Sequence, residues 1–124
     1  MAEKLVIAGA TGGVGRRCVY YAVTDSRVSS VTAIMRSSPK PAAFYGLTDS
    51  QAEFSKLKQV TVDFTNLDAS ASAFAGCTAG ISCLGVYSSE MKDYTMFMQR
   101  EHAPNMKIAS LAAAGGVSAY AYLR

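Results

Sequence analysis

The sequence contains few of the residues that build metal centres or disulfide frameworks. Among its 124 residues there are one histidine, His102, and three cysteines, Cys18, Cys77 and Cys83. The cysteines lack the paired spacing of a zinc site and the density of a disulfide framework, so we expect buried or partly buried free thiols in a reducing compartment. His102 has no evident carboxylate or nucleophile partner along the sequence, which favours a surface or helix-start histidine over a catalytic one.

Long apolar runs and a strong net charge are also absent. No stretch approaches the ~20 apolar residues of a membrane span, and the short apolar run after Glu3 and Lys4 does not resemble a signal peptide. The net charge is only +3, and no basic run or aromatic–basic stripe is typical of nucleic-acid binding. These properties predict a single cytoplasmic domain with no membrane span and no nucleic-acid partner.

Glycine, by contrast, is concentrated in one stretch. Residues 9–15 read GATGGVG, follow an apolar run at 5–8 and open a helical pattern. A glycine loop between a strand and a helix is the context in which a dinucleotide pyrophosphate binds at the helix N-terminus. Gly9 allows a tight turn, Gly12 lets the backbone approach the pyrophosphate, and Gly15 lets the helix lie close to the sheet. The spacing is G-x-x-G-x-x-G rather than G-x-G-x-x-G, and a glycine-rich turn that binds nothing is the alternative.

The rest of the chain alternates strand and helix patterns, which predicts a parallel sheet with helices on both faces. Apolar and β-branched runs predict strands at residues 4–8, 30–35, 59–62, 79–84 and 119–123. Helical patterns predict helices at residues 13–24, 49–57, 67–75 and 103–114. We expect N-caps at Asp49 and near Asn66, a looser segment ahead of Pro104, and a left-handed glycine cap after Ala114.

Five stretches carry a resemblance to a known family, in the family's order. They are residues 9–15 (GATGGVG), 31–37 (VTAIMRS), 62–64 (VDF), 73–85 (AFAGCTAGISCLG) and 112–116 (AAAGG). The chain resembles the N-terminal half of an atypical short-chain dehydrogenase/reductase. It is most similar to the Tat-interacting-protein oxidoreductase-like group, which also resembles the NmrA-like nucleotide sensors.

The resemblance implies a Rossmann-type α/β fold that binds NADP(H). The expected fold is a doubly wound parallel sheet of about five strands in the order 3-2-1-4-5, with residues 1–124 forming one NAD(P)-binding domain. The family carries two or more further strands and its catalytic residues beyond the point where this sequence stops. We therefore expect the N-terminal portion of such a fold, without the catalytic portion.

Arg36 predicts which dinucleotide is bound. It ends the second expected strand, about 20 residues after the glycine loop, where an acid would hold the 2′-hydroxyl of NAD and an arginine suits the 2′-phosphate of NADP. Residues 31–38 contain no Asp or Glu, and Ser37 can add a hydroxyl donor. The alternative is a solvent-exposed basic residue, and Arg16 and Arg17 are open to the same two interpretations. We expect NADP(H), with NAD less favoured.

Residues at the ends of the third and fourth expected strands complete the predicted site. In similar proteins, positions matching Asp63 and Phe64 contact the adenine ring, although an aspartate that caps the following turn is the alternative. Cys83 and its two successors close the fourth strand opposite the glycine loop, with Cys83 itself in a packing role. The predicted cofactor residues are Gly9, Thr11, Gly12, Gly13, Val14, Gly15, Arg36, Ser37, Asp63, Phe64, Cys83, Leu84 and Gly85.

Catalysis in this family uses a tyrosine whose pKa is lowered by a lysine one helical turn away. None of the seven tyrosines here has a lysine four residues on; Tyr120 has Arg124, on an expected strand. We therefore expect no catalytic residue and no hydride transfer in this chain as it stands, with Tyr87 and Ser88 as candidates to face a small-molecule substrate. The alternatives are an NADP(H) sensor that acts through a protein partner and a scaffold that binds no nucleotide.

Overall fold

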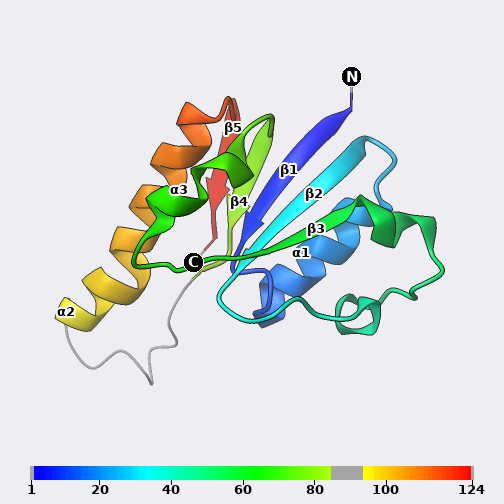
Figure 1. The fold of residues 1–124 in the computed structure, drawn as a ribbon, viewed down its shortest axis with the longest axis horizontal. Coiled ribbons are helices and arrows are strands. Elements are labelled where there is room, and N and C mark those ends of the chain that lie inside the picture. Colours follow the sequence, from blue (N-terminus) through cyan, green and yellow to red (C-terminus); the bar gives the residue numbers. More distant parts are fainter. Residues whose placement is uncertain (1, 85–93, 124) are drawn as a thin grey trace.

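The computed structural model describes residues 2–84 and 94–123. Within them, five parallel strands form one sheet in the order β3-β2-β1-β4-β5 (Figure 1). The strands are β1 (Glu3–Ala8), β2 (Val28–Met35), β3 (Leu57–Thr61), β4 (Ala79–Ser82) and β5 (Ala119–Tyr122). This confirms the predicted doubly wound order, in which the direction of strand addition reverses beside β1.

Helices cover both faces of the sheet (Figure 1). The first face carries α1 (Gly13–Thr24) and the 3₁₀ helix η1 (Ala42–Tyr45), and the second carries α3 (Ala103–Ala114) and the 3₁₀ helix η3 (Leu67–Phe74). The remaining short helices are η2 (Ala52–Lys56), α2 (Tyr94–Phe97) and the π-helix η4 (Met98–His102).

The continuous apolar run of β1 follows from this layering. Ile7 belongs to the apolar core under α1 with Val19 and Val31, whereas Val6 belongs to the core under α3 with Ile108. None of these five side chains is more than 1% exposed. Because successive strand residues point to opposite faces and both faces are covered, the buried positions of β1 must be apolar on both faces, whereas Glu3 and Lys4 at its start are exposed. Burial of each such side chain contributes roughly 1.5–3 kcal/mol.

Two expected α-helices were wrong in type. Residues 49–57 contain only η2, which has Gln51 rather than Asp49 at its N-cap, because β3 already begins at Leu57 and pairs there with Val31. Residues 67–75 form η3, which is non-helical at Ser70, and Asn66 makes no side-chain capping bond. Segments this short do not hold an α-helix without extensive packing, and only the two end residues of η3 are buried.

Strand boundaries also shift. The second strand begins at Val28 rather than residue 30, because Val28 pairs with Glu3. The fourth strand ends at Ser82 rather than residue 84. The cause is local, since the amide of Leu84 donates to Ser82 Oγ at 3.3 Å and so leaves the ladder.

The expected helix at 103–114 is confirmed, and the segment ahead of it is a π-helix. Pro104 has no N–H to donate to the carbonyl oxygen of Arg100, four residues earlier, so the hydrogen-bonding pattern loosens there. The helix ends where Gly116 adopts a φ of +107°, the left-handed conformation expected of a glycine after Ala114.

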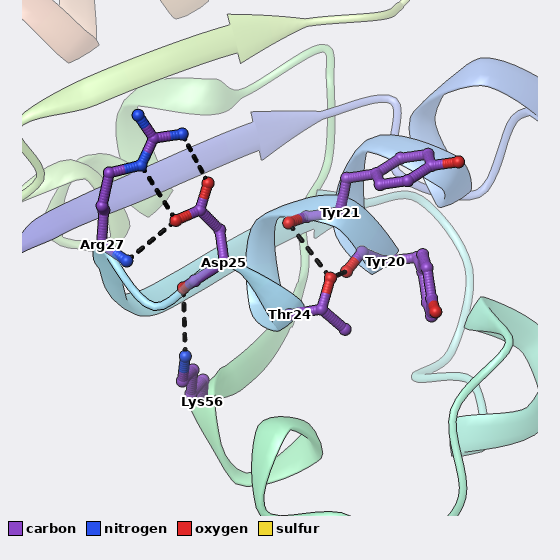
Figure 2. Close-up of polar contacts among 6 residues, drawn as sticks. All are labelled: Tyr20, Tyr21, Thr24, Asp25, Arg27 and Lys56. Atoms are coloured by element: carbon purple, nitrogen blue, oxygen red, sulfur yellow. Dashed lines mark hydrogen bonds and ion pairs between the residues drawn. The ribbon is translucent and has the colours of Figure 1, made fainter.

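Polar contacts stabilise the C-terminal end of α1 and the turn that follows it (Figure 2). Thr24 Oγ1 donates to the carbonyl oxygen of Tyr20 at 2.8 Å, and Lys56 Nζ donates to the carbonyl oxygen of Asp25 at 3.3 Å. Arg27 donates to the Asp25 carboxylate three times, through its backbone amide at 2.8 Å, Nε at 3.1 Å and Nη2 at 2.7 Å. These contacts close the turn that leads from α1 into β2.

The Asp25 carboxylate gives this turn a pH dependence. The hydrogen bonds from Arg27 lower the pKa of Asp25 from 3.8 to about 2. A carboxyl whose pKa is lower in the folded chain stabilises the fold above the unfolded value and loses that contribution as the pH falls through the folded value. Asp25→Asn should lower the urea midpoint of unfolding slightly at neutral pH, since the partner side chain, Arg27, is 84% exposed and an ion pair near solvent contributes little. The difference should shrink as the pH falls from 3.8 towards 2, and a difference that does not change with pH would contradict this role.

Candidate functional site

The loop between β1 and α1 is packed so tightly that two of its positions require glycine. Gly9 has a φ of +73°, and a Cβ on it would lie 2.7 Å from the backbone nitrogen of Leu84. A Cβ on Gly15 would lie 1.9 Å from the carbonyl oxygen of Gly9. At Gly12, by contrast, a Cβ would be 3.6 Å from its nearest neighbour, and φ is −74°. The fold therefore leaves Gly12 free to serve another purpose.

The N-terminus of α1 has no anionic or hydroxyl partner of its own. Gly12 is the N-cap and makes no side-chain capping bond, and the first turn contains no acidic residue. The first amides of an α-helix have no intrahelical acceptor, so those of Gly13, Val14 and Gly15 are available to a ligand. Together with the positive end of the helix dipole they favour an anion.

A cavity of about 140 Å³, here called the strand-end cavity, is lined by Gly12, the residue that directly precedes these amides. It lies where β1, β2 and β4 reach their carboxyl ends, which is the crevice in which open α/β sheets bind ligands. Its lining contains no acidic side chain. The lining residues are Gly9, Thr11, Gly12, Met35, Arg36, Phe64, Cys83 and Leu84.

The structure thus brings together predicted residues from four segments of the chain. Of the other predicted residues, Gly13, Val14, Gly15, Ser37 and Asp63 do not line the cavity. Gly85, Tyr87 and Ser88 lie outside the described residues. Met35 lines the cavity without having been predicted, because an apolar residue at a strand end gives no chemical signal.

Ser37 and Asp63 have different surroundings from each other. The Ser37 hydroxyl is buried and has no hydrogen-bond partner among the described residues. Asp63 is exposed, and its Oδ1 accepts from the amide and hydroxyl of Thr65 at 2.9 and 2.6 Å. These bonds lower the pKa of Asp63. These are the contacts expected of an aspartate that caps the following turn, the alternative interpretation of Asp63. The other carboxylate oxygen, Oδ2, has no hydrogen-bond donor among the described residues.

Buried polar side chains that sequence reasoning missed hold the cavity wall. Asn105, 7% exposed, donates through Nδ2 to the carbonyl oxygens of Leu84 at 3.0 Å and Glu101 at 2.8 Å. Its Oδ1 accepts from the fully buried hydroxyl of Ser82, which also accepts from the amide of Leu84. The backbone amide and the carbonyl oxygen of Leu84 are therefore both held by hydrogen bonds to buried side chains. The available signal was a serine inside an apolar strand and an asparagine on the buried face of a helix.

Asn105→Leu should lower the free energy of unfolding by about 2 kcal/mol, because the substitution leaves buried polar partners without hydrogen bonds. It should also weaken ligand binding at the cavity, since Leu84 loses its support. Urea unfolding measures the first effect. Asn66→Leu is the matched control, because Asn66 is exposed and makes no side-chain capping bond. Equal unfolding midpoints for the two variants would contradict the positioning role of Asn105.

A larger hollow of about 460 Å³ lies between α1 and η1, and is here called the α1–η1 hollow. Arg16, Arg17 and four aromatic side chains line it together with Ala43 and Gly46. The Arg16 guanidinium carbon lies 5.6 Å from the centre of the Phe44 ring. No glycine-loop residue lines this hollow, so despite its size it offers none of the uncapped helix amides that would bind a pyrophosphate.

Other kinds of site find no support in residues 2–84 and 94–123. No group of three or more His, Cys, Asp or Glu side chains there is arranged to hold a metal ion. No helix in that part of the chain has the length and apolar character needed to cross a membrane. His102 is exposed at the N-cap of α3, as expected of a helix-start histidine.

Comparison with known proteins gives a family and a fold. A family model described as NAD(P)H-binding matches residues 9–123. Uronate dehydrogenase from Agrobacterium tumefaciens, including a mutant complexed with NAD, is 19% identical, with a TM-score of 0.69 over 98% of this chain and 40% of that one. A short-chain dehydrogenase/reductase from Veillonella parvula is 12% identical, with a TM-score of 0.64 over 98% and 47%.

An epimerase has the same fold. UDP-glucuronic acid 4-epimerase from Bacillus cereus, solved as a mutant with a UDP-sugar analogue and NAD, is 16% identical, with a TM-score of 0.67 over 96% of this chain and 39% of that one. At such identities these likenesses establish the fold alone. The chain spans less than half the length of each of these relatives.

Proposed function

Because the chain belongs to the NAD(P)H-binding family, we propose that its strand-end cavity binds the pyrophosphate and adjoining ribose of NADP(H). The observation that carries the proposal is that Gly12, the N-cap that directly precedes the uncapped amides of α1, lines one cavity together with Arg36. At about 140 Å³ the cavity is small; pockets that enclose a drug-sized ligand measure roughly 300–1,000 Å³. The rest of the dinucleotide would therefore lie across the open strand ends.

The glycine loop would bind the pyrophosphate. The amides of Gly13, Val14 and Gly15 would donate to its oxygens, while Thr11 and Gly12 would contact it from the cavity wall. Hydrogen bonds to a charged partner contribute more than neutral ones. A cationic side chain is not needed at this point of the site.

Arg36 would select NADP over NAD. It follows β2, the position at which an acid would bind the ribose diol of NAD, and the cavity lining contains no acid. Its guanidinium can donate two parallel hydrogen bonds to a phosphate. The unpartnered Ser37 hydroxyl, next along the chain, is suited to join it. Arg16 and Arg17 line the α1–η1 hollow and are the weaker candidates for this role.

The two ends of the dinucleotide would follow the outer strands. Phe64 would cover the adenine, with the Oδ2 of Asp63 accepting from its exocyclic amine. Cys83, Leu84 and Gly85 would line the side of the second ribose and the nicotinamide.

We assign residues 1–124 to one NADP(H)-binding domain of an oxidoreductase that resembles the Tat-interacting-protein group and acts in the cytoplasm. Such an enzyme transfers hydride to or from a small carbonyl or alcohol substrate. This chain has no tyrosine followed by lysine four residues on, so its catalytic pair would lie outside the sequence given. A sensor that reports NADP(H) to a protein partner would use the same cavity without that pair.

Fluorescence titration of the chain with NADPH and NADH tests the proposal. We expect NADPH to bind at least about tenfold more tightly, since one charge-assisted contact contributes roughly 1.5–3 kcal/mol. Equal affinities would show that Arg36 is merely solvated, and no binding of either would overturn the proposed function. In a hydride-transfer assay with aldehydes, ketones and quinones, we expect no turnover by residues 1–124 alone.

A further inference from the structure

Two thiols far apart in the sequence meet at the wall of the strand-end cavity. The Sγ atoms of Cys18, on α1, and Cys83, after β4, lie 3.8 Å apart. Both cysteines are free and partly buried, and Cys83 lines the cavity. The third cysteine, Cys77, is buried in the core under α3, where its thiol faces the carbonyl oxygen of Ala73.

We propose that Cys18 and Cys83 are an oxidation site that closes to an intramolecular disulfide and thereby weakens dinucleotide binding in the strand-end cavity. The effect on binding rests on the proposed function, whereas disulfide formation does not. The oxidant that fits is a peroxide, because it needs no binding site of its own and is small enough to reach a partly buried thiol.

The reaction balances with hydrogen peroxide. One cysteine thiolate attacks a peroxide oxygen and the O–O bond breaks, which gives a sulfenic acid; the departing hydroxide takes up the proton that the thiol had released and becomes one water. The second thiol attacks that sulfur, its proton leaves with the hydroxyl as a second water, and the S–S bond forms. The two thiols lose two electrons and the peroxide gains them. Burial, with the neighbouring Cys18, raises the pKa of Cys83, which disfavours the Cys83 thiolate. We therefore assign the first attack to Cys18 and the attack on the sulfenic acid to Cys83.

Closure would move the cavity wall. A disulfide holds its sulfurs about 2.05 Å apart, whereas the two thiols are 3.8 Å apart. The backbone of Cys83 is fixed beside the glycine loop, since its amide donates to the carbonyl oxygen of Ala8 at 2.9 Å and Gly9 packs against its carbonyl group. Displacement of Cys83 therefore displaces Leu84 and the loop together. By linkage, a bound dinucleotide would disfavour closure by the same factor.

The test oxidises the full chain with hydrogen peroxide and follows it by intact mass, peptide mapping and NADPH titration. We expect a mass loss of about 2 Da for the two thiol hydrogens, a peptide pair linking Cys18 to Cys83, and an NADPH affinity about tenfold lower. Reduction with a dithiol should restore both mass and affinity. Cys77→Ser should behave like the unaltered chain, and Cys18→Ser should lose neither mass nor affinity. Cys83→Ser should retain a sulfenic acid at Cys18 that dimedone labels.

Other results of the same experiment would overturn one part of the proposal or another. A mass loss that persists in Cys18→Ser, or a link that involves Cys77, would overturn the pairing. A Cys18–Cys83 link with unchanged NADPH affinity would overturn its coupling to the cavity. If the reduced chain does not bind NADPH at all, the proposed function fails, while mass and mapping still decide whether the disulfide forms.

Discussion

Gly12→Val is expected to lower the affinity for NADPH about a hundredfold or more while leaving the fold intact. Gly12 lines the strand-end cavity and precedes the uncapped amides of α1. A branched side chain there would occupy the space through which the pyrophosphate reaches those amides. Each charge-assisted hydrogen bond that is lost costs about 1.5 kcal/mol or more of binding free energy, so the loss of two lowers the affinity about a hundredfold.

The fold should tolerate this change because it does not require glycine at Gly12. Its φ of −74° suits any residue, and the nearest atom to a Cβ would be the carbonyl oxygen of Gly9 at 3.6 Å. Loss of a favourable N-cap residue should cost at most about 1 kcal/mol. Gly15→Ala should instead destabilise the chain severely, because its Cβ would lie 1.9 Å from that same oxygen. NADPH titration and urea unfolding of both variants separate loss of binding from loss of stability. Unchanged NADPH affinity in Gly12→Val would contradict the assignment of this loop as the pyrophosphate-binding loop.

Arg36→Asp is expected to erase or reverse the preference for NADPH over NADH. The substitution removes the guanidinium donors and places a carboxylate at the end of β2, where it would repel the 2′-phosphate and accept from the ribose hydroxyls of NADH. The ratio of the two affinities should change about a hundredfold, since one charge-assisted contact is lost and an opposing one gained. Titration of both nucleotides into both proteins measures this ratio.

Arg27→Asp is the matched control for this change in charge. Arg27 immediately precedes β2 and Arg36 immediately follows it, so the two substitutions alter the net charge equally at opposite ends of one strand. The Arg27 side chain is 84% exposed and is paired with Asp25. Its loss should lower stability slightly and leave the affinity ratio unchanged. If both variants shift the ratio alike, Arg36 acts through net charge rather than through contact.

The features predicted correctly from the sequence were those that local pattern determines. The glycine loop was predictable because the positive φ of Gly9 and the close contact of Gly15 with the carbonyl oxygen of Gly9 both lie within seven residues of chain. The strand order followed from the alternation of strands and helices together with the family resemblance. The cavity could be anticipated because the carboxyl ends of parallel strands meet at one edge.

What the sequence could not predict depends on contacts between distant residues. The support of Leu84 by Asn105 spans 21 residues, and the approach of Cys18 to Cys83 spans 65. No spacing rule relates such pairs, because the fold alone determines which of them meet. The errors in the segments at 49–57 and 67–75 have a related cause, since strand pairing and sparse packing override helix propensity there.

The most direct test of the central claim is to locate NADPH on the chain by the amide chemical shifts of the isotope-labelled protein. If the strand-end cavity binds the dinucleotide, the largest changes during titration will occur at Thr11, Gly12 and Arg36, with little change at Tyr21 and Gly46 in the α1–η1 hollow. Changes centred on Tyr21 and Gly46, with the glycine loop unaffected, would contradict the account.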